Sequence, residues 1–481
     1  MRREKGSITV FSIISLLLIT ATVFALLEGS RLQELRRFAN LQTEAAVESV
    51  FANYNGCLWS KYRLLGADQT QWEEILQKTA NARTKESGIN LLAFALEKAE
   101  LESYTLLTDG SGSIFIKSVS TYMKDNILYE SAKEIYNQYE AIKHLIDSSS
   151  MDKSKIEEAI KEAEAVSWES VETSVGTSGT QNTKNSINPI DLLKAAKRLQ
   201  EYGILELVIK DSSKLSKSEI DFSNGLLERE LKTGKKPQKV TTDWLDRVLL
   251  QQYLLTYLSN FREIKSERAL SYELEYLLGE KSSDIENLKV IVTRILAIRE
   301  AANFLYLISD PAKVLQAETM ATLIGGTSLN PIIIEVIKVG LLTAWALAES
   351  VLDVRALLAG KHVPLLKSEE SWTLELENIG KITQEFCMAK ESLLGLTYEN
   401  YLGILLLFEE EQSLAMKTMN IQEATIQKEY GDSSFHLDTL ITEAKATISY
   451  TYDLVFPFLE VVNAEKKWEY KICIEKEYGY Y

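Results

Sequence analysis

An uncharged apolar run from Ser7 to Leu27 constrains this chain more than any other feature of its sequence. As an α-helix the run would be about 30 Å long, which is close to the thickness of the hydrocarbon core of a bilayer. We therefore predict one membrane-spanning helix at residues 7–27. The side chains expected to contact lipid are Ile8, Val10, Phe11, Ile13, Ile14, Leu16, Leu17, Leu18, Ile19, Val23, Phe24, Leu26 and Leu27.

The charges on either side of this run indicate how it is oriented. Residues 1–6 form a short basic end, and cations beside an apolar segment tend to stay in the cytoplasm. We therefore expect a single-pass protein of the cell membrane whose large C-terminal part is extracellular. Cations at the other end of the run, at Arg31, Arg36 and Arg37, reduce this asymmetry.

A cleaved secretory signal is the rival interpretation of the same run. The stretch Val23-Phe24-Ala25 passes as a cleavage motif, but the apolar Leu26 and Leu27 follow at once. However, the run is longer than the apolar core of about 7–15 residues that is usual in such signals. We therefore favour a retained anchor and keep cleavage as the alternative.

Composition favours a helical, acidic body behind the anchor. A chain of 481 residues with only 6 prolines is typical of long helices, and its length indicates two or three subdomains. The formal net charge of −16 argues against nucleic acid as a partner, because phosphates would repel the body. The expected fold class is α+β and predominantly α-helical, with a helical-bundle ectodomain and a small antiparallel β-sheet at the C-terminal end.

Residues 28–172 predict a membrane-proximal helical region with a short hairpin. Apolar periodicity extends the first helix to Tyr54 and indicates a second helix over residues 71–99. A Gly-rich turn at residues 108–113, between two short apolar runs, predicts the hairpin. A phosphate-binding loop is the alternative, but the Gly-Lys-Ser/Thr ending is missing and we expect no helix directly after the turn.

Further helices are expected from Tyr122 to Val171. The polar, low-complexity stretch at residues 173–188 then predicts a linker or loop.

Residues 189–430 predict a helical bundle. Its clearest helix starts at a capping box, Ser283 to Glu286, and ends at Asp310-Pro311. The apolar run from Pro331 to Gly360 competes as a second membrane span, but charged residues leave only about ten uncharged positions, which is too few to cross a bilayer. We expect a buried central helix there, and one further long helix over residues 397–430.

Residues 431–481 predict an antiparallel strand region. Apolar and polar residues alternate over residues 444–452 and again over residues 468–475, which is the period of a half-buried strand. We expect these two strands to pair through a loop at Pro457.

The sequence contains no catalytic, cofactor-binding or metal-binding motif that we can identify. The acidic run Glu409-Glu410-Glu411 would point in different directions on a helix, so a solvated surface is the simpler interpretation. Three cysteines, Cys57, Cys387 and Cys473, lie far apart, and we interpret them as small apolar fillers, while one disulfide stays open. We expect no catalytic residue, cofactor or metal.

The N-terminal region resembles the TadE/TadG-like proteins of tight-adherence, type IV pilin-like systems. The resemblance rests on Lys5-Gly6-Ser7 before the apolar run, on the polar turn at residues 27–33 and on the Ala-rich stretch at residues 40–46. It implies processing by a prepilin peptidase between Gly6 and Ser7. Pilins carry Glu at the fifth position after that cut, where this chain has Phe11, and this departure argues against a major pilin.

Three functions are compatible with these features. The first is a structural or assembly role, such as a minor pilin or pseudopilin-like component, with membrane lipid and other pilus or secretion-system subunits as partners and a homo-oligomer left open. The second is an anchored or secreted enzyme that acts on cell-wall polymers through Asp and Glu residues. The third is a surface ligand-binding module built on the helical bundle.

Overall fold

The chain forms two compact units in the computed structural model. Unit 1 consists of residues 1–122, 229–242 and 433–481, and unit 2 consists of residues 123–228 and 243–432. The structure describes residues 4–86, 94–125, 133–137, 139–140, 143, 203–211, 213, 215–237, 240–325, 331–382, 385–393, 395–431, 433–455 and 470–480. As predicted, these residues are mostly helical, with a small antiparallel sheet.

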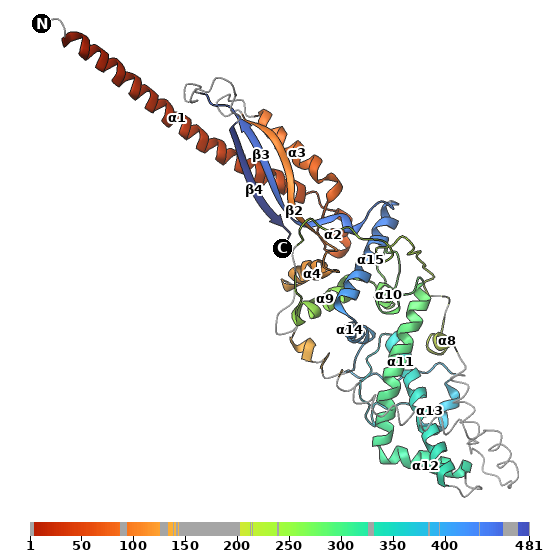
Figure 1. Ribbon diagram of the computed structural model, residues 1–481. Helices are drawn as coiled ribbons and strands as arrows, with labels where there is room; N and C mark the ends of the chain where they lie inside the picture. The colour runs from red at the N-terminus through yellow and green to blue at the C-terminus, as the bar shows by residue number, and fades with distance from the viewer. Residues whose placement is uncertain are drawn as a thin grey trace. The chain divides into compact units, whose positions relative to one another are not determined.

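Helix α1 (Glu4–Phe51) is the longest element of unit 1 (Figure 1). The predicted span and the helix predicted after it are therefore one continuous helix, as expected from the apolar period. Its C-terminal half belongs to the core of unit 1, where Leu35, Ala39, Val50 and Phe51 are at most 2% exposed. These positions recur at helical spacing, so one face of the helix is buried.

The sheet of unit 1 is centred on β3 (Leu440–Tyr452), which pairs antiparallel with every other strand. One edge of β3 carries β2 (Phe94–Leu106), and the other carries β4 (Tyr470–Gly479) and the short β1 (Ala67–Asp68). The predicted pairing of the two C-terminal strands is confirmed, with Tyr450 opposite Ile472. The alternating pattern of β3 places its apolar side chains in the core.

Strand β2 corrects the prediction of a helix over residues 71–99. Helix α3 (Gln69–Glu86) covers only the first part of that range, and Phe94 to Ala99 are extended. The local pattern at Phe94–Ala99 is compatible with a helix, but pairing with β3 over the whole length of β2 decides the outcome. Such long-range pairing leaves no periodic signal in the sequence of β2 itself.

The hairpin predicted around residues 108–113 is also wrong. The first apolar run is the end of β2, but the second lies in α4 (Ser113–Lys124), which begins directly after the turn. Gly110 has a φ of 64°, which a glycine adopts without strain. The buried Asp109 carboxylate holds the turn by accepting hydrogen bonds from the backbone N–H groups of Leu106, at 2.7 Å, and Gly234, at 3.1 Å.

Unit 1 also contains helix α2 (Gly56–Tyr62) and the 3-10 turn η4 (Leu437–Thr439). The Asn55 side chain caps α2 by accepting a hydrogen bond from Leu58 N–H at 2.9 Å.

The regular elements in the described part of unit 2 are helices, joined by turns and loops. Its elements are α8 (Ile204–Val208), α9 (Trp244–Tyr257), α10 (Glu273–Gly279), α11 (Asp284–Ser309), α12 (Pro311–Gly325), α13 (Pro331–Leu358), η3 (Leu376–Lys381), α14 (Tyr398–Phe408) and α15 (Glu411–Tyr430). Helix α13 packs against both α11 and α12 (Figure 1). Helices are therefore present in the region where the sequence predicted them, although turns and loops cover much of residues 209–228 and 359–397.

Helix α11 begins and ends at the residues that the sequence predicted. Ser283 caps it by accepting a hydrogen bond from Glu286 N–H at 3.3 Å, and Asp310 ends it before Pro311. Helix α13 is largely buried around Trp345, as predicted for the central helix.

The single helix predicted over residues 397–430 is instead two helices that separate at Glu409 and Glu410. Arg247 stabilises this break by donating to the carbonyl oxygens of Leu407 and Glu409. Most of the helices predicted from Tyr122 to Val171, and the linker at residues 173–188, lie outside the described residues.

Candidate functional site

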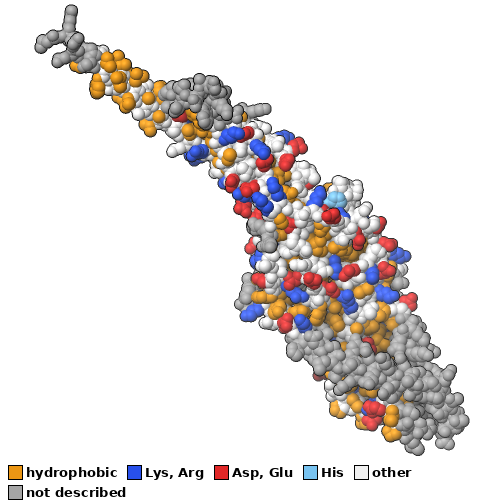
Figure 2. All heavy atoms as spheres, in the orientation of Figure 1, with side chains coloured by type: hydrophobic (Ala, Val, Ile, Leu, Met, Phe, Trp, Pro, Cys, Tyr) orange, Lys and Arg blue, Asp and Glu red, His pale blue; other side chains and the backbone are white. Residues whose placement is uncertain are grey.

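The first half of α1 has an apolar surface that the rest of the described chain leaves uncovered. From Ile8 to Leu27 the large apolar side chains are 49–74% exposed, except Phe24, which is half-buried. Figure 2 shows these hydrophobic side chains along the free part of the helix. Among the described residues, α1 is the one helix long and apolar enough to cross a membrane.

This exposure has a large free-energy cost in water. At about 25 cal/mol per Å² of apolar surface, burying a dozen exposed large side chains would release on the order of 10–20 kcal/mol of free energy. A surface of this size needs an apolar environment. A lipid bilayer provides one along the full length of the segment.

Hydroxyl groups within the segment are compatible with a lipid environment. Ser12 Oγ donates to the carbonyl oxygen of Ile8 at 2.9 Å, Thr20 Oγ1 to that of Leu16 at 2.7 Å, and Thr22 Oγ1 to that of Ile19 at 2.7 Å. Each of these three hydroxyls is thus satisfied inside its own helix. Polar groups that find a partner this way remove most of the cost of burial in hydrocarbon.

The proposed processing residues lie in the first turns of the same helix. Gly6 and Ser7 have helical backbone, and their side chains fall outside the part of the chain whose burial is described. Cleavage between them therefore stays a prediction. Phe11, which stands where pilins carry Glu, is 71% exposed on the apolar surface.

The second half of α1 is tied to the sheet by polar as well as apolar contacts. Thr43 Oγ1 and the Tyr450 hydroxyl are 3.3 Å apart, and the Tyr480 hydroxyl donates to the carbonyl oxygen of Phe51 at 2.6 Å. The Phe51 ring lies edge-on to Trp72, with centroids 5.3 Å apart. The apolar segment is therefore the direct extension of a helix fixed in a folded core.

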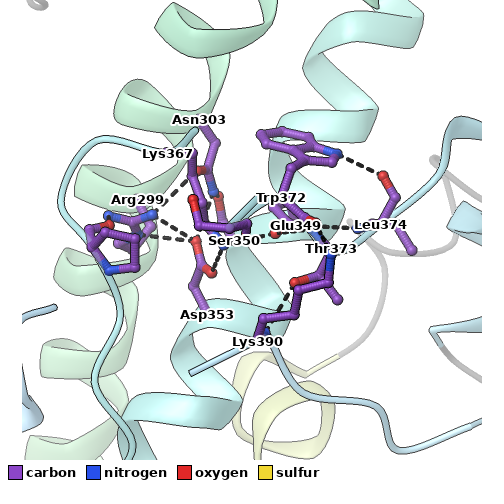
Figure 3. Close-up of polar contacts among 12 residues, drawn as sticks. Arg299, Asn303, Glu349, Ser350, Asp353, Lys367, Trp372, Thr373, Leu374 and Lys390 are labelled. Atoms are coloured by element: carbon purple, nitrogen blue, oxygen red, sulfur yellow. Dashed lines mark hydrogen bonds and ion pairs between the residues drawn. The ribbon is translucent and has the colours of Figure 1, made fainter. Parts of the chain in front are cut away.

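Unit 2 contains a second arrangement that stands out chemically, a cluster of four charged side chains on or near α11 and α13 (Figure 3). Arg299 donates from Nε and Nη2 to Asp353 Oδ2, at 3.0 and 2.8 Å. Lys367 Nζ lies 2.7 Å from Asp353 Oδ1 and 2.7 Å from Glu349 Oε1. All four side chains are fully buried, and their formal charges cancel.

The remaining polar atoms of this charged cluster bind backbone groups. Glu349 accepts hydrogen bonds from the N–H groups of Thr373, at 3.1 Å, and Leu374, at 2.8 Å. Arg299 Nη1 donates to the carbonyl oxygens of Pro364 and Leu365. Burial raises the pKa of the Glu349 carboxyl, while the Lys367 ammonium group opposes that rise. These bonds fasten the segment of residues 364–374 onto two helices.

Because its charges are paired within unit 2, the charged cluster holds α11, α13 and residues 364–374 together. The Trp345 and Trp372 side chains both donate to the carbonyl oxygen of Leu374 and pack edge-to-face beside it, with centroids 5.7 Å apart. A catalytic acid or base needs a free proton-accepting atom that can reach a substrate. The oxygens of Glu349 and Asp353 are instead occupied by partners within unit 2.

A carboxyl group in α10 has a less complete set of partners. Glu275 is fully buried, and its Oε1 accepts hydrogen bonds from Phe261 N–H at 2.9 Å and from the Tyr398 hydroxyl at 2.7 Å. Its Oε2 has no hydrogen-bond partner among the described residues. Burial raises the pKa of Glu275 to about 7.

The acidic run at residues 409–411 lies at the break between α14 and α15, so our description of it as part of one helix was wrong. Glu409 pairs with Arg294 at 3.0 Å, and Glu411 pairs with Arg247 at 3.9 Å. The run is therefore engaged in partly exposed ion pairs.

Only one of the three cysteines is a core residue. Cys57 is buried, as a small apolar filler would be, whereas Cys387 and Cys473 are exposed. The interpretation of all three as fillers was therefore wrong for two of them. Alternation in β4 places Cys473 on the solvent side, opposite Ser449.

Comparison with known proteins identifies a family for the body of the chain. Residues 180–452 match a protein family described as a family of unknown function (DUF5702). Because the match spans more than half of the chain, the protein belongs to this family. No curated protein and no solved structure matches the chain.

Sequence reasoning missed the charged cluster of unit 2, although one signal was present. Glu349, Asp353 and Arg355 interrupt the apolar pattern of α13, and we used such charges only to argue against a membrane span. Three charges in the buried part of a helix require partners elsewhere in the chain. The position of Arg299 in α11 could not be matched to them without the fold.

Proposed function

We propose that this chain is a single-pass membrane protein whose large C-terminal body is extracellular and has a structural role. The observation that carries the proposal is the continuity of α1: one helix is bare and apolar over residues 8–27 and part of a folded core over residues 35–51. Such a helix fixes the body to the membrane without a flexible linker. Gly29 lies inside it without interrupting it.

Within this role, we propose assembly in a tight-adherence, type IV pilus-like system as a minor pilin or pseudopilin-like component. The resemblance of residues 5–7, 27–33 and 40–46 to TadE/TadG-like proteins supports this part. Partners would be membrane lipid and other pilus or secretion-system subunits. Lateral contacts would form through residues 7–27.

We also propose that the protein is not an enzyme. Support comes from the buried acids, which accept hydrogen bonds from backbone groups: Glu349 from Thr373 and Leu374, and Glu273 from Ser259 at 2.9 Å. Carboxylates used in this way hold loops in place.

The two exposed cysteines provide a direct test of the topology. A membrane-impermeant maleimide added to intact cells is expected to label Cys387 and Cys473, and to label the buried Cys57 only after denaturation. The matched control is the Cys387→Ser, Cys473→Ser double variant, which should stay unlabelled on intact cells. Labelling that requires cell lysis would contradict an extracellular body.

The mass of the mature protein from membranes separates the remaining alternatives. An intact N-terminus supports a simple anchor, a start at Ser7 supports the pilin route, and a start just after Ala25 supports secretion. Cross-linking on intact cells followed by identification of the partners would test the assembly role. Recovery of the chain only as an uncross-linked monomer would argue against that role.

A further inference from the structure

The end of the unit 1 sheet lies close to the end of the apolar segment of α1. Arg31 joins the two, because its Nη1 donates to Glu28 Oε1 at 2.5 Å and its Nη2 donates to the carbonyl oxygen of Asp453 at 3.0 Å. Leu27 is the last apolar residue of the segment, so the Arg31 backbone lies about 6 Å further along the helix axis. Asp453 follows β3 directly. The sheet therefore ends within about one helical turn of the segment.

The side chains at this end of the sheet suit a membrane interface. Tyr452, the last residue of β3, lies opposite Tyr470, the first residue of β4, and their ring centroids are 5.7 Å apart. Both rings are half-buried, and Val455 nearby is 37% exposed. Tyrosine, with an apolar ring and a polar tip, is enriched where hydrocarbon meets headgroups.

The opposite end of the same sheet has a different relation to α1. There Tyr478 packs against Phe51, with ring centroids 4.8 Å apart, at the C-terminal end of the helix. The seven residue steps from Tyr470 to Glu477 place that end about 23 Å from the first. The two ends of β4 should therefore lie at different distances from the bilayer, and comparing them measures that difference within one strand.

We propose that the end of the sheet formed by Arg31, Tyr452, Asp453, Val455 and Tyr470, the membrane-facing edge, is seated in the phospholipid headgroup layer that surrounds α1. This inference rests on the proposed membrane anchor. It identifies which surface of unit 1 contacts the lipid headgroups. The headgroup layer of one leaflet is about 5–8 Å thick, which matches the 6 Å between Leu27 and Arg31 along the helix. Unit 1 thus lies directly on the bilayer surface, with no exposed length of α1 between them.

Fluorescence quenching by spin-labelled lipid tests this seating. Full-length protein in which Cys57→Ala, Cys387→Ser and Cys473→Ser remove the native thiols is reconstituted in phosphatidylcholine vesicles. A bimane label is attached at Val455→Cys, or at Glu477→Cys as the matched control, and lipid with a nitroxide on its headgroup is added. A third variant carries the bimane label at Leu18→Cys. Its quenching by lipid with a nitroxide in the acyl chain tests whether the segment at residues 8–27 lies in the bilayer. Circular dichroism confirms that each variant is folded.

Quenching of the label at position 455 should be at least about twofold stronger than at position 477, because about 23 Å of strand separates the two ends. Equal, weak quenching at both positions, with strong quenching at position 18, would refute the seating and leave the anchor intact. Absence of quenching at position 18 would refute the anchor itself, and the seating with it.

Discussion

Replacing Glu275 with glutamine should change how the stability of unit 2 depends on pH. The Glu275 carboxyl has an ordinary pKa of 4.5, which burial raises to about 7 in the folded protein. The folded state therefore holds a proton between pH 4.5 and 7 that the unfolded state has already released. Stability must fall as pH rises through this interval, because the folded state binds more protons than the unfolded state.

The size of the effect follows from the shift. A difference of about 2.5 pKa units at about 1.36 kcal/mol per unit amounts to about 3 kcal/mol, lost mostly between pH 4.5 and 7. The hydrogen bonds that Oε1 accepts from Phe261 N–H and the Tyr398 hydroxyl oppose the rise, and the nearby Asp284 charge adds to it. Glu275→Gln cannot ionise, so this contribution to the pH dependence should disappear.

Urea unfolding of full-length protein in nanodiscs, followed by tryptophan fluorescence, measures the difference. Glu275→Gln is expected to match the parent near pH 4.5 and to exceed its stability by up to about 3 kcal/mol at pH 8. Glu318→Gln, at an exposed position of α12, is the matched control and should follow the parent at both pH values. Parallel curves for parent and Glu275→Gln would refute the assignment of a buried, partly unsatisfied carboxyl.

Three further substitutions test other parts of the fold by the same unfolding measurement. Asp353→Ala leaves Arg299 and Lys367 without their shared carboxylate in a fully buried site, and should cost about 3–5 kcal/mol. Phe51→Ala removes a side chain that is 2% exposed between α1 and the sheet, and should cost about 3–5 kcal/mol in unit 1. Ser283→Ala removes the cap of α11 and should cost about 1 kcal/mol, and an unchanged stability would show that the cap bond is not formed in solution.

The elements that the sequence predicted correctly are those whose signals are local. The apolar segment at residues 7–27, the cap at Ser283 and the alternation in β3 each depend on neighbouring residues, and each is present in the structure. The errors arose where distant residues decide the conformation. Strand β2 is extended because β3 pairs with it, and the break at Glu409 is held by Arg247 from α9.

The two candidate sites differ in the same respect, because one has a local sequence signal and the other depends on distant residues. The exposed apolar segment of α1 could be predicted because a run of apolar residues is a local signal. The charged cluster could not, because Arg299, Asp353 and Lys367 are separated in the chain and meet only after α11 and α13 have packed. A charge pattern identifies residues that need partners without identifying the partners.

The topology of unit 1 has a consequence for the order in which the protein can fold. The buried face of α1, which includes Leu35 and Phe51, packs partly on β3 and β4, and these strands come from the C-terminal region of the chain. Strand β2 likewise pairs with β3 across more than 300 residues of sequence. Contacts this distant form late, because the intervening chain must first be ordered or confined. The apolar segment at residues 8–27 needs no such contact, so its helix can form before the core that the second half of α1 will join. The second half of α1 therefore exposes Leu35 and Phe51 until β3 and β4 have been added to the fold.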